Sequence, residues 1–232
     1  MKKIFLGLFL PISLIANVTK VIVSSGVDLV IKPSKYSDSF RSSNNPVASF
    51  TESNGVLMVK ARNSFLSRHA KVELDLASPL TYIEVQGDSN VMLDHAKTKK
   101  LSVISSGNGA ISLKGNIKLA KIDKTGAGII RGIWINADDL KINSQYGQIE
   151  LAGRCNSMHL YGDKDSVINT QYLRCDNVWV RAKDYTSISI LPAKHMKVWA
   201  TDNSQVFYRK TVDYLNRNTD SFDHALVMHV SK

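Results

Sequence analysis

Apolar and polar residues alternate along most of the chain, and the alternation restarts at regular intervals between residues 81 and 208. This stretch divides into seven segments that each open with a strand-like alternation. The openings lie 18–20 residues apart, at Thr81, Leu101, Ala120, Leu140, Met158, Val178 and Met196. Alternation with a period of two is typical of a β-strand with one buried face. Each segment is therefore predicted to begin with a short strand.

A turn follows each predicted strand, and most segments then show a second short strand. The turns are rich in Gly, Asn, Asp, Ser and Lys, as in residues 106–109 and 126–128. A unit this short cannot bury its apolar face alone and must stack on copies of itself. Leucine-rich repeats have a similar length, but no segment shows their consensus or a helical period. The predicted fold class is all-β, a parallel β-helix (β-solenoid) of about seven coils with capped ends.

The turns and their flanking strands resemble a bacterial family described as putative auto-transporter adhesin, head GIN domain. The residues that carry the resemblance are 83–87, 101–111, 125–129 and 140–149, with 55–59 and 72–74 upstream. The resemblance extends over about residues 21–209 and weakens at 163–165 and 184–186, where charged or bulky residues replace Ser-Gly turns. It implies a right-handed β-solenoid and an envelope or extracellular location.

The start of the chain has the pattern of a secretory signal peptide. Lys2 and Lys3 precede an apolar run at 4–15, and Ala16 is a small residue before the expected cleavage. An uncleaved anchor is the alternative. The mature chain is expected to contain no transmembrane segment. Its expected divisions are an N-terminal cap with irregular first coils at 17–80, regular coils at 81–208 and a C-terminal cap or tail at 209–232.

The two cysteines, Cys155 and Cys175, each lie three residues before the opening of the next coil. Stacked coils would place them about 4.8 Å apart, which is within the range of disulfide Cα separations. An exported protein also meets an oxidising environment. In-register stacking could instead aim both side chains the same way, so two buried thiols remain the alternative to a disulfide.

The sequence contains no recognised catalytic, cofactor or metal motif. The glycines at 107, 109, 126 and 128 recur with the coil, so we interpret them as corner residues rather than phosphate-binding ones. A glycan-degrading β-helix would need clustered carboxylates, whereas Glu84, Asp123 and Glu150 belong to distant coils. We therefore expect a protein without catalytic residues, cofactor or metal.

Residues at the second and fourth positions of the leading strands are expected to face solvent. In the last three coils these positions hold three aromatic side chains, a histidine and two cations, namely His159, Tyr161, Trp179, Arg181, Lys197 and Trp199. Exposed aromatic clusters can stack on sugar rings, and the cations can pair with anionic groups. The competing interpretation is that the C-terminal segment folds over these residues and buries them.

The formal charge of +10 favours anionic partners. A denser basic set is expected on the surface at Lys97, Lys99, Lys100, Lys114, Lys118, Lys121 and Lys124. A merely solvated face explains the charge equally well. The leading hypothesis is a non-catalytic, adhesin-like protein, periplasmic, outer-membrane associated or secreted, that binds a glycan or an anionic envelope component; nucleic acid is not expected. The alternatives are a structural envelope component and a glycan-degrading enzyme.

Overall fold

The computed structural model describes residues 12–13, 17–24, 26–42, 48–62, 69–209 and 216–231. This part of the chain consists of strands and turns and contains no helix. The strands are β1 (Ile12–Ser13), β2 (Lys20–Val23), β3 (Val27–Pro33), β4 (Ser39–Ser42), β5 (Ala48–Ser53), β6 (Val56–Ala61), β7 (Ala70–Leu76), β8 (Leu80–Val85), β9 (Asn90–Asp94), β10 (Thr98–Ser105), β11 (Ala110–Lys124), β12 (Ile129–Ala182), β13 (Ser187–Ala200), β14 (Gln205–Tyr208), β15 (Asn216–Ser221) and β16 (Leu226–His229).

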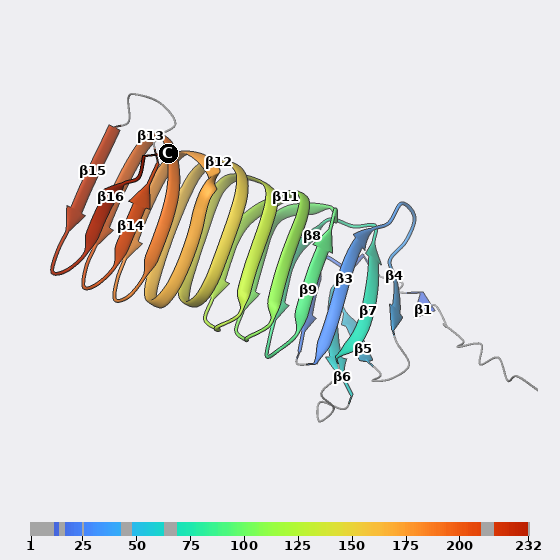
Figure 1. The fold of residues 1–232 in the computed structure, drawn as a ribbon. Coiled ribbons are helices and arrows are strands. Elements are labelled where there is room, and N and C mark those ends of the chain that lie inside the picture. The colour runs from blue at the N-terminus through green and yellow to red at the C-terminus, as the bar shows by residue number, and fades with distance from the viewer. Residues whose placement is uncertain are drawn as a thin grey trace, which may run out of the picture.

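The strands wind into a flattened rod of coils stacked in parallel, and from β8 onward each coil stacks on the one before it (Figure 1). β12 is 54 residues long because the chain rounds several corners without leaving strand geometry. We call the side that contains β2, β8 and β15 the first sheet, and the side that contains β3, β9 and β16 the second sheet. The predicted β-solenoid is confirmed, with its coils in the predicted order.

The core consists of ladders of apolar side chains along the rod. At the third position of the leading strands, Ile83, Val103, Ile122 and Ile142 follow one another in register and are fully buried. Each coil thus covers the apolar face of its neighbour, which removes apolar surface from water at roughly 25 cal/mol per Å². This stacking is why no single coil could be stable alone.

A polar ladder lies two residues further along the same strands. Ser105, Lys124 and Ser144 are in register and are all almost completely buried. The Nζ atom of Lys124 donates a hydrogen bond to the carbonyl of Gly126. The prediction that Lys124 belongs to the basic surface is therefore wrong. The sequence interpretation assigned only the first and third residues of this strand to the core, whereas the fifth residue, Lys124, is also buried.

The N-terminal end is built out of chain order. β2 lies between β6 and β8, and β3 lies between β7 and β9, so the first coil in sequence is enclosed by two later ones. Beyond it, β5 pairs antiparallel with β6, and β4 pairs antiparallel with β7. A hairpin turn at Asn54 and Gly55 joins β5 to β6, and both residues have positive φ.

The C-terminal segment forms one more rung of the solenoid. β15 pairs in parallel with β13, and β16 pairs in parallel with β14. The segment expected to close over the last coil thus extends both sheets in their own planes. It does not fold across the outer face of the first sheet.

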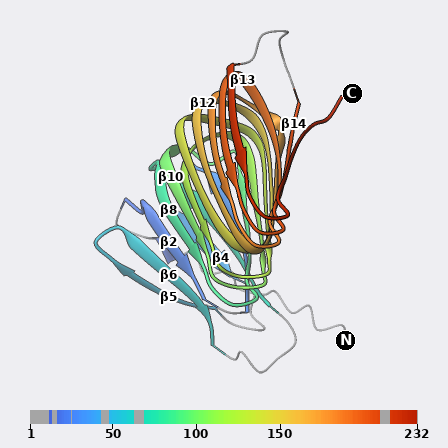
Figure 2. The same ribbon diagram turned by 90° about the vertical axis from the view of Figure 1, so that its left-hand side faces the viewer.

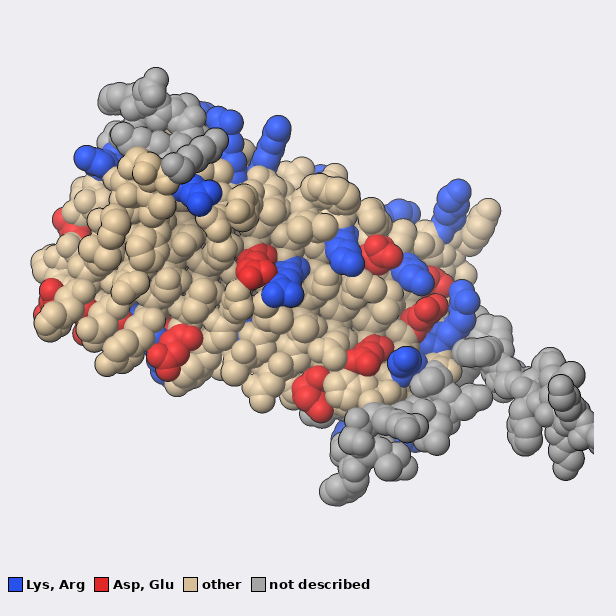
Figure 3. Space-filling model, viewed as in Figure 1, with Lys and Arg blue, Asp and Glu red and all other residues tan. Residues whose placement is uncertain are grey.

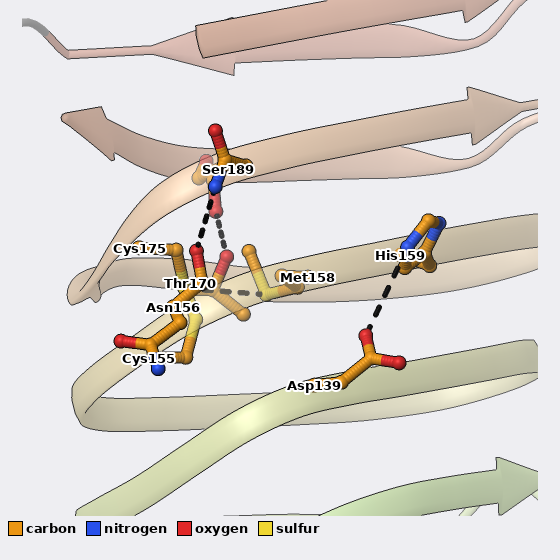
Figure 4. Close-up of a disulfide and its surroundings, with 9 residues drawn as sticks. Asp139, Cys155, Asn156, Met158, His159, Thr170, Cys175 and Ser189 are labelled. Carbon is orange, nitrogen blue, oxygen red and sulfur yellow. Dashed lines mark hydrogen bonds and ion pairs between the residues drawn. A yellow bond between two sulfur atoms is a disulfide. The ribbon is translucent and has the colours of Figure 1, made fainter. Parts of the chain in front are cut away.

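A disulfide joins Cys155 and Cys175 in the segment that returns the chain from the second sheet to the first (Figure 4). Their Cα atoms are 4.5 Å apart. Both side chains are buried, and the Sγ atom of Cys175 also lies 4.0 Å from Sδ of Met158. The predicted disulfide is confirmed over the alternative of two thiols.

Replacing both cysteines with alanine should lower the free energy of unfolding by about 3 kcal/mol, because the bridge closes a loop of roughly 20 residues in the unfolded chain. The measurement is the denaturant midpoint with and without a reductant. With the reductant, the denaturant midpoint of the wild type should fall to that of the double variant. The midpoint of the double variant should be the same with and without the reductant. Equal wild-type midpoints in both conditions, with free thiols verified, would contradict a stabilising bridge.

Candidate ligand-binding face

The six residues singled out in the sequence lie on the outer face of the first sheet. Trp179 is in register with Lys197, and Arg181 is in register with Trp199. The residues that alternate with them, such as Val178, Val180 and Val198, are buried in the core. The strand alternation therefore delivers all six side chains to one surface, which we call the aromatic face.

The rings of His159 and Trp179 stack across neighbouring coils. Their centroids are 4.5 Å apart, and their planes differ by only 7°. Nε2 of His159 also lies 3.8 Å from a carboxylate oxygen of Asp139 on the preceding coil (Figure 4). The spacing between parallel strands is close to the stacking distance of flat rings, so the fold itself sets this contact.

The guanidinium of Arg181 lies over the ring of Trp199, with its carbon 4.5 Å from the ring centroid. Phe222 approaches the same ring at 6.3 Å in a tilted arrangement. Lys141 lies one coil before Tyr161. Its Nζ atom lies over the Tyr161 ring, 5.6 Å from the ring centroid. Cation–π contacts of this kind fix the direction of each ring while leaving part of its surface free.

The aromatic face is open to solvent. Tyr161 is 42% exposed and Trp179 is 38% exposed. Trp199 is half-buried, because Arg181 and Phe222 cover part of its ring. The C-terminal strand β15 continues the sheet beside β13 rather than covering it, so the competing arrangement with buried tryptophans is absent from the described residues.

The electrostatic character of the face follows from its two outward rows. Over four coils they hold Lys141, His159, Trp179 and Lys197 in one row and Asn143, Tyr161, Arg181 and Trp199 in the other. Neither row contains a carboxylate along this length. Rows of rings and cations can place flat apolar surface against a sugar ring and a positive charge against an acidic substituent. Carboxylates flank the strip, with Asp139 beside His159 and Asp220 beside Trp199.

Two hollows of the surface lie away from the aromatic face. A hollow of about 680 Å³ lies at the N-terminal end, where Asp28, Arg41 and Glu73 are among its lining residues. A smaller one of about 290 Å³ lies beside Arg131 and Tyr172. Neither hollow is lined by a residue of the aromatic face. The outer surface of a sheet along a rod suits an extended ligand better than a small one.

One ionic cluster outside the face ties the N-terminal coils together. Nδ1 of His69 lies 2.7 Å from Asp28, and Nε2 lies 3.3 Å from Asp88. The hydrogen bond to Asp28 raises the pKa of His69 above its usual value.

Within the described ranges no group of three or more His, Cys, Asp or Glu residues could hold a metal ion. Nor does any helix in these ranges have the length and apolarity needed to cross a membrane.

Several solved structures share the fold of this chain. A putative adhesin from Parabacteroides merdae superposes with a TM-score of 0.80 at 16% identity, over 95% of each chain. A putative lipid binding protein from Parabacteroides distasonis superposes with a TM-score of 0.78 at 14% identity, over 95% of this chain and 97% of that one. A putative adhesin from the same species superposes with a TM-score of 0.74 at 14% identity, over 95% of each chain. At these identities the likeness concerns the fold.

No curated protein matches the chain. A family model described as "Putative auto-transporter adhesin, head GIN domain" matches residues 17–146. The match is shorter than the sequence resemblance, which extended to residue 209, and it ends before the six residues of the aromatic face. It nevertheless covers more than half of the chain. The chain therefore belongs to the family of the auto-transporter adhesin head GIN domain.

Proposed function

We propose that this protein is a non-catalytic, exported, adhesin-like protein that binds acidic glycans along the aromatic face. Family membership supports the adhesin-like character. The observation that carries the ligand class is the strip of rings and cations between Lys141 and Trp199, which contains no carboxylate in either outward row. The basic formal charge of the chain acts in the same direction.

The chemistry of the strip favours sugars that carry carboxylate, sulfate or phosphate groups. Trp179 offers ring surface held in place by the stacked His159, and sugar C–H groups pack well on such a surface. Lys197 lies beside Trp179 on the next coil, where it can pair with an anionic substituent of the bound sugar. Surface charge pairs are screened by salt, so binding should weaken as ionic strength rises.

Acrylamide quenching of tryptophan fluorescence tests this function. The protein should carry Trp134→Phe, because Trp134 is 64% exposed and lies at a distant corner beside His95. Trp179 and Trp199 should be accessible to the quencher and should become protected when an acidic glycan or lipopolysaccharide is added. A neutral glycan of the same length is the control ligand. Protection by none of them would refute the proposed ligand class.

Replacing Trp179 and Trp199 together with alanine should remove glycan binding. Stacking of a nucleic-acid base on an aromatic residue is typically worth about 1–3 kcal/mol. We expect a similar scale for a sugar ring, so losing two aromatic rings should weaken binding by about two orders of magnitude. Thermal stability should change little, since Trp179 and the half-buried Trp199 both lie on the outer face of the first sheet and not in the core. The matched control is Trp134→Ala, which removes an exposed tryptophan elsewhere. Unchanged binding in the double variant would exclude the aromatic face as the site.

The exported location rests on the leader-like sequence at residues 1–16 and on the envelope context of the family. The disulfide between Cys155 and Cys175 supports it, because such bonds persist in oxidising compartments. Cell fractionation should find the chain in the periplasm, the outer membrane or the medium. Recovery of the intact chain from the cytoplasm alone would contradict export.

A further inference from the structure

The two ends of the rod are finished differently. At the N-terminal end, antiparallel strands β5 and β4 lie along the last parallel strands, β6 and β7. At the C-terminal end the last rung is made of β15 and β16, which face the viewer in Figure 2. Among the described residues, β15 pairs only with β13 and β16 only with β14. Both strands therefore have one free edge.

The hydrogen bonds of β16 show which backbone groups face outward. The N–H of Leu226 donates to the carbonyl of Ser204, and the N–H of Val230 donates to that of Tyr208. Alternate residues of a strand direct their N–H groups to opposite neighbours. The N–H groups of Val227 and His229 therefore point away from the rod. An open edge of this kind is a template for another strand.

The sequence of this edge is the opposite of what natural proteins use to block strand addition. β16 has no charge, proline or glycine, whereas protected edges commonly carry lysine, proline or a bulge. Leu226 and Met228 point outward and are 39% and 43% exposed, and Phe207 is the neighbour of Met228 on the preceding strand. Figure 3 shows few charged side chains on the second sheet near this end.

We propose that two copies of the chain associate tail to tail, with the free edges of β15 and β16 pairing across a twofold axis. The sequences of both edges suit this occupant. Antiparallel pairing centred on Val227 sets Leu226 opposite Met228 of the second copy. Pairing centred on Met228 sets Leu226 opposite Val230 of the second copy. Every outward cross-strand pair in β16 is then apolar, which stabilises a sheet.

The pairing of β15 with its copy is also free of like charges. Its charged residues are Arg217 and Asp220. Across a twofold axis a residue faces its own copy only when the axis passes through it. Because β15 has one cation and one acid, Arg217 and Asp220 face a like charge only in that case. Centred on Thr219, Arg217 meets Ser221 and Asp220 meets Asn218. The arrangement is isologous and closes at two copies.

Sedimentation equilibrium of the purified full chain over a wide concentration range tests the proposal. The mass should rise from one copy to two and stop there. Leu226→Lys with Met228→Lys should raise the dissociation constant at least about tenfold, because like charges face each other across the paired edges. The matched control is Val167→Lys. Val167 is outward, 44% exposed and in the same row of the second sheet, but it lies three coils from the end.

A charge exchange separates loss of pairing from loss of folding. Leu226→Glu with Met228→Glu should also be monomeric alone, and an equal mixture of the lysine and glutamate variants should form a heterodimer at the wild-type concentration. A chain that stays monomeric at all concentrations would overturn the proposal. So would a mass that grows past two copies, or a Val167→Lys variant that dissociates as readily as the edge variant.

Discussion

Gly107→Ala should lower the free energy of unfolding by about 3 kcal/mol or more, because one methyl group at this position has no space. A Cβ atom on Gly107 would lie 1.7 Å from the carbonyl oxygen of Gly87 on the preceding coil. That neighbour is backbone and cannot rotate away. The same clash recurs one coil later, where a Cβ on Gly126 would lie 2.1 Å from the carbonyl oxygen of Gly107.

The measurement is the urea midpoint of the variant, with Asn108→Ala as the matched control. Asn108 is the next residue of the same turn and is exposed. Its replacement should change the free energy of unfolding by no more than about 0.5 kcal/mol. Equal midpoints for Gly107→Ala and wild type would show that the corner can open at little cost, which contradicts close stacking of the turns.

The solenoid was predictable from the sequence because its main signal is local and repeated. The alternation that opens each coil names the buried residues directly, as at Ile83 and Val103, and the repeat length allows few other folds. The glycines at the corners were also interpreted correctly as structural. Each packs against the backbone of the preceding turn, as Gly107 does against Gly87 and Gly126 against Gly107, which explains why they recur with the coil.

Features that depend on contacts between distant segments were not predictable. The place of β2 between β6 and β8 reverses the chain order, and no local pattern of the sequence encodes that insertion. A cap or tail was predicted at residues 209–232, but only the structure shows that β15 and β16 extend the two sheets there. For the candidate site, alternation placed the six side chains on one face. The contacts of Arg181 with Trp199 and of His159 with Trp179 required the register between coils.

Lys124 is the residue for which the sequence pattern predicted the wrong environment, since it is buried and not on the surface. Its replacement is expected to change the stability of the protein strongly. Its side chain is 1% exposed and lies between Ser105 and Ser144, neither of which carries a charge. A Cβ on Gly147 would lie 2.5 Å from the Lys124 Nζ atom, so the absence of a side chain at Gly147 leaves room for the ammonium group. Burial lowers the pKa of Lys124 from 10.5 to about 8, because removal from water disfavours the charged form.

Lys124→Met should therefore stabilise the protein at pH 7. A pKa lowered by about 2.5 units corresponds to roughly 3 kcal/mol against folding while the lysine is charged in both states. Loss of the hydrogen bond to the Gly126 carbonyl offsets about 1 kcal/mol of the gain. The net expectation is an increase of about 2 kcal/mol in the free energy of unfolding. Lys118→Met removes an exposed lysine and serves as the control, with a change near zero.

The pH dependence of this gain distinguishes charge burial from better packing. Between about pH 8 and 10.5 the unfolded chain keeps the Lys124 proton and the folded chain has released it, so the unfolded state binds more protons. Wild-type stability should then rise with pH relative to that of Lys124→Met, and the advantage of the variant should shrink across this window. Chemical unfolding of both proteins at pH 7, 9 and 10.5 measures the difference. An advantage that stays constant over the three pH values would mean that folding does not lower the pKa of Lys124, so that the gain comes from packing.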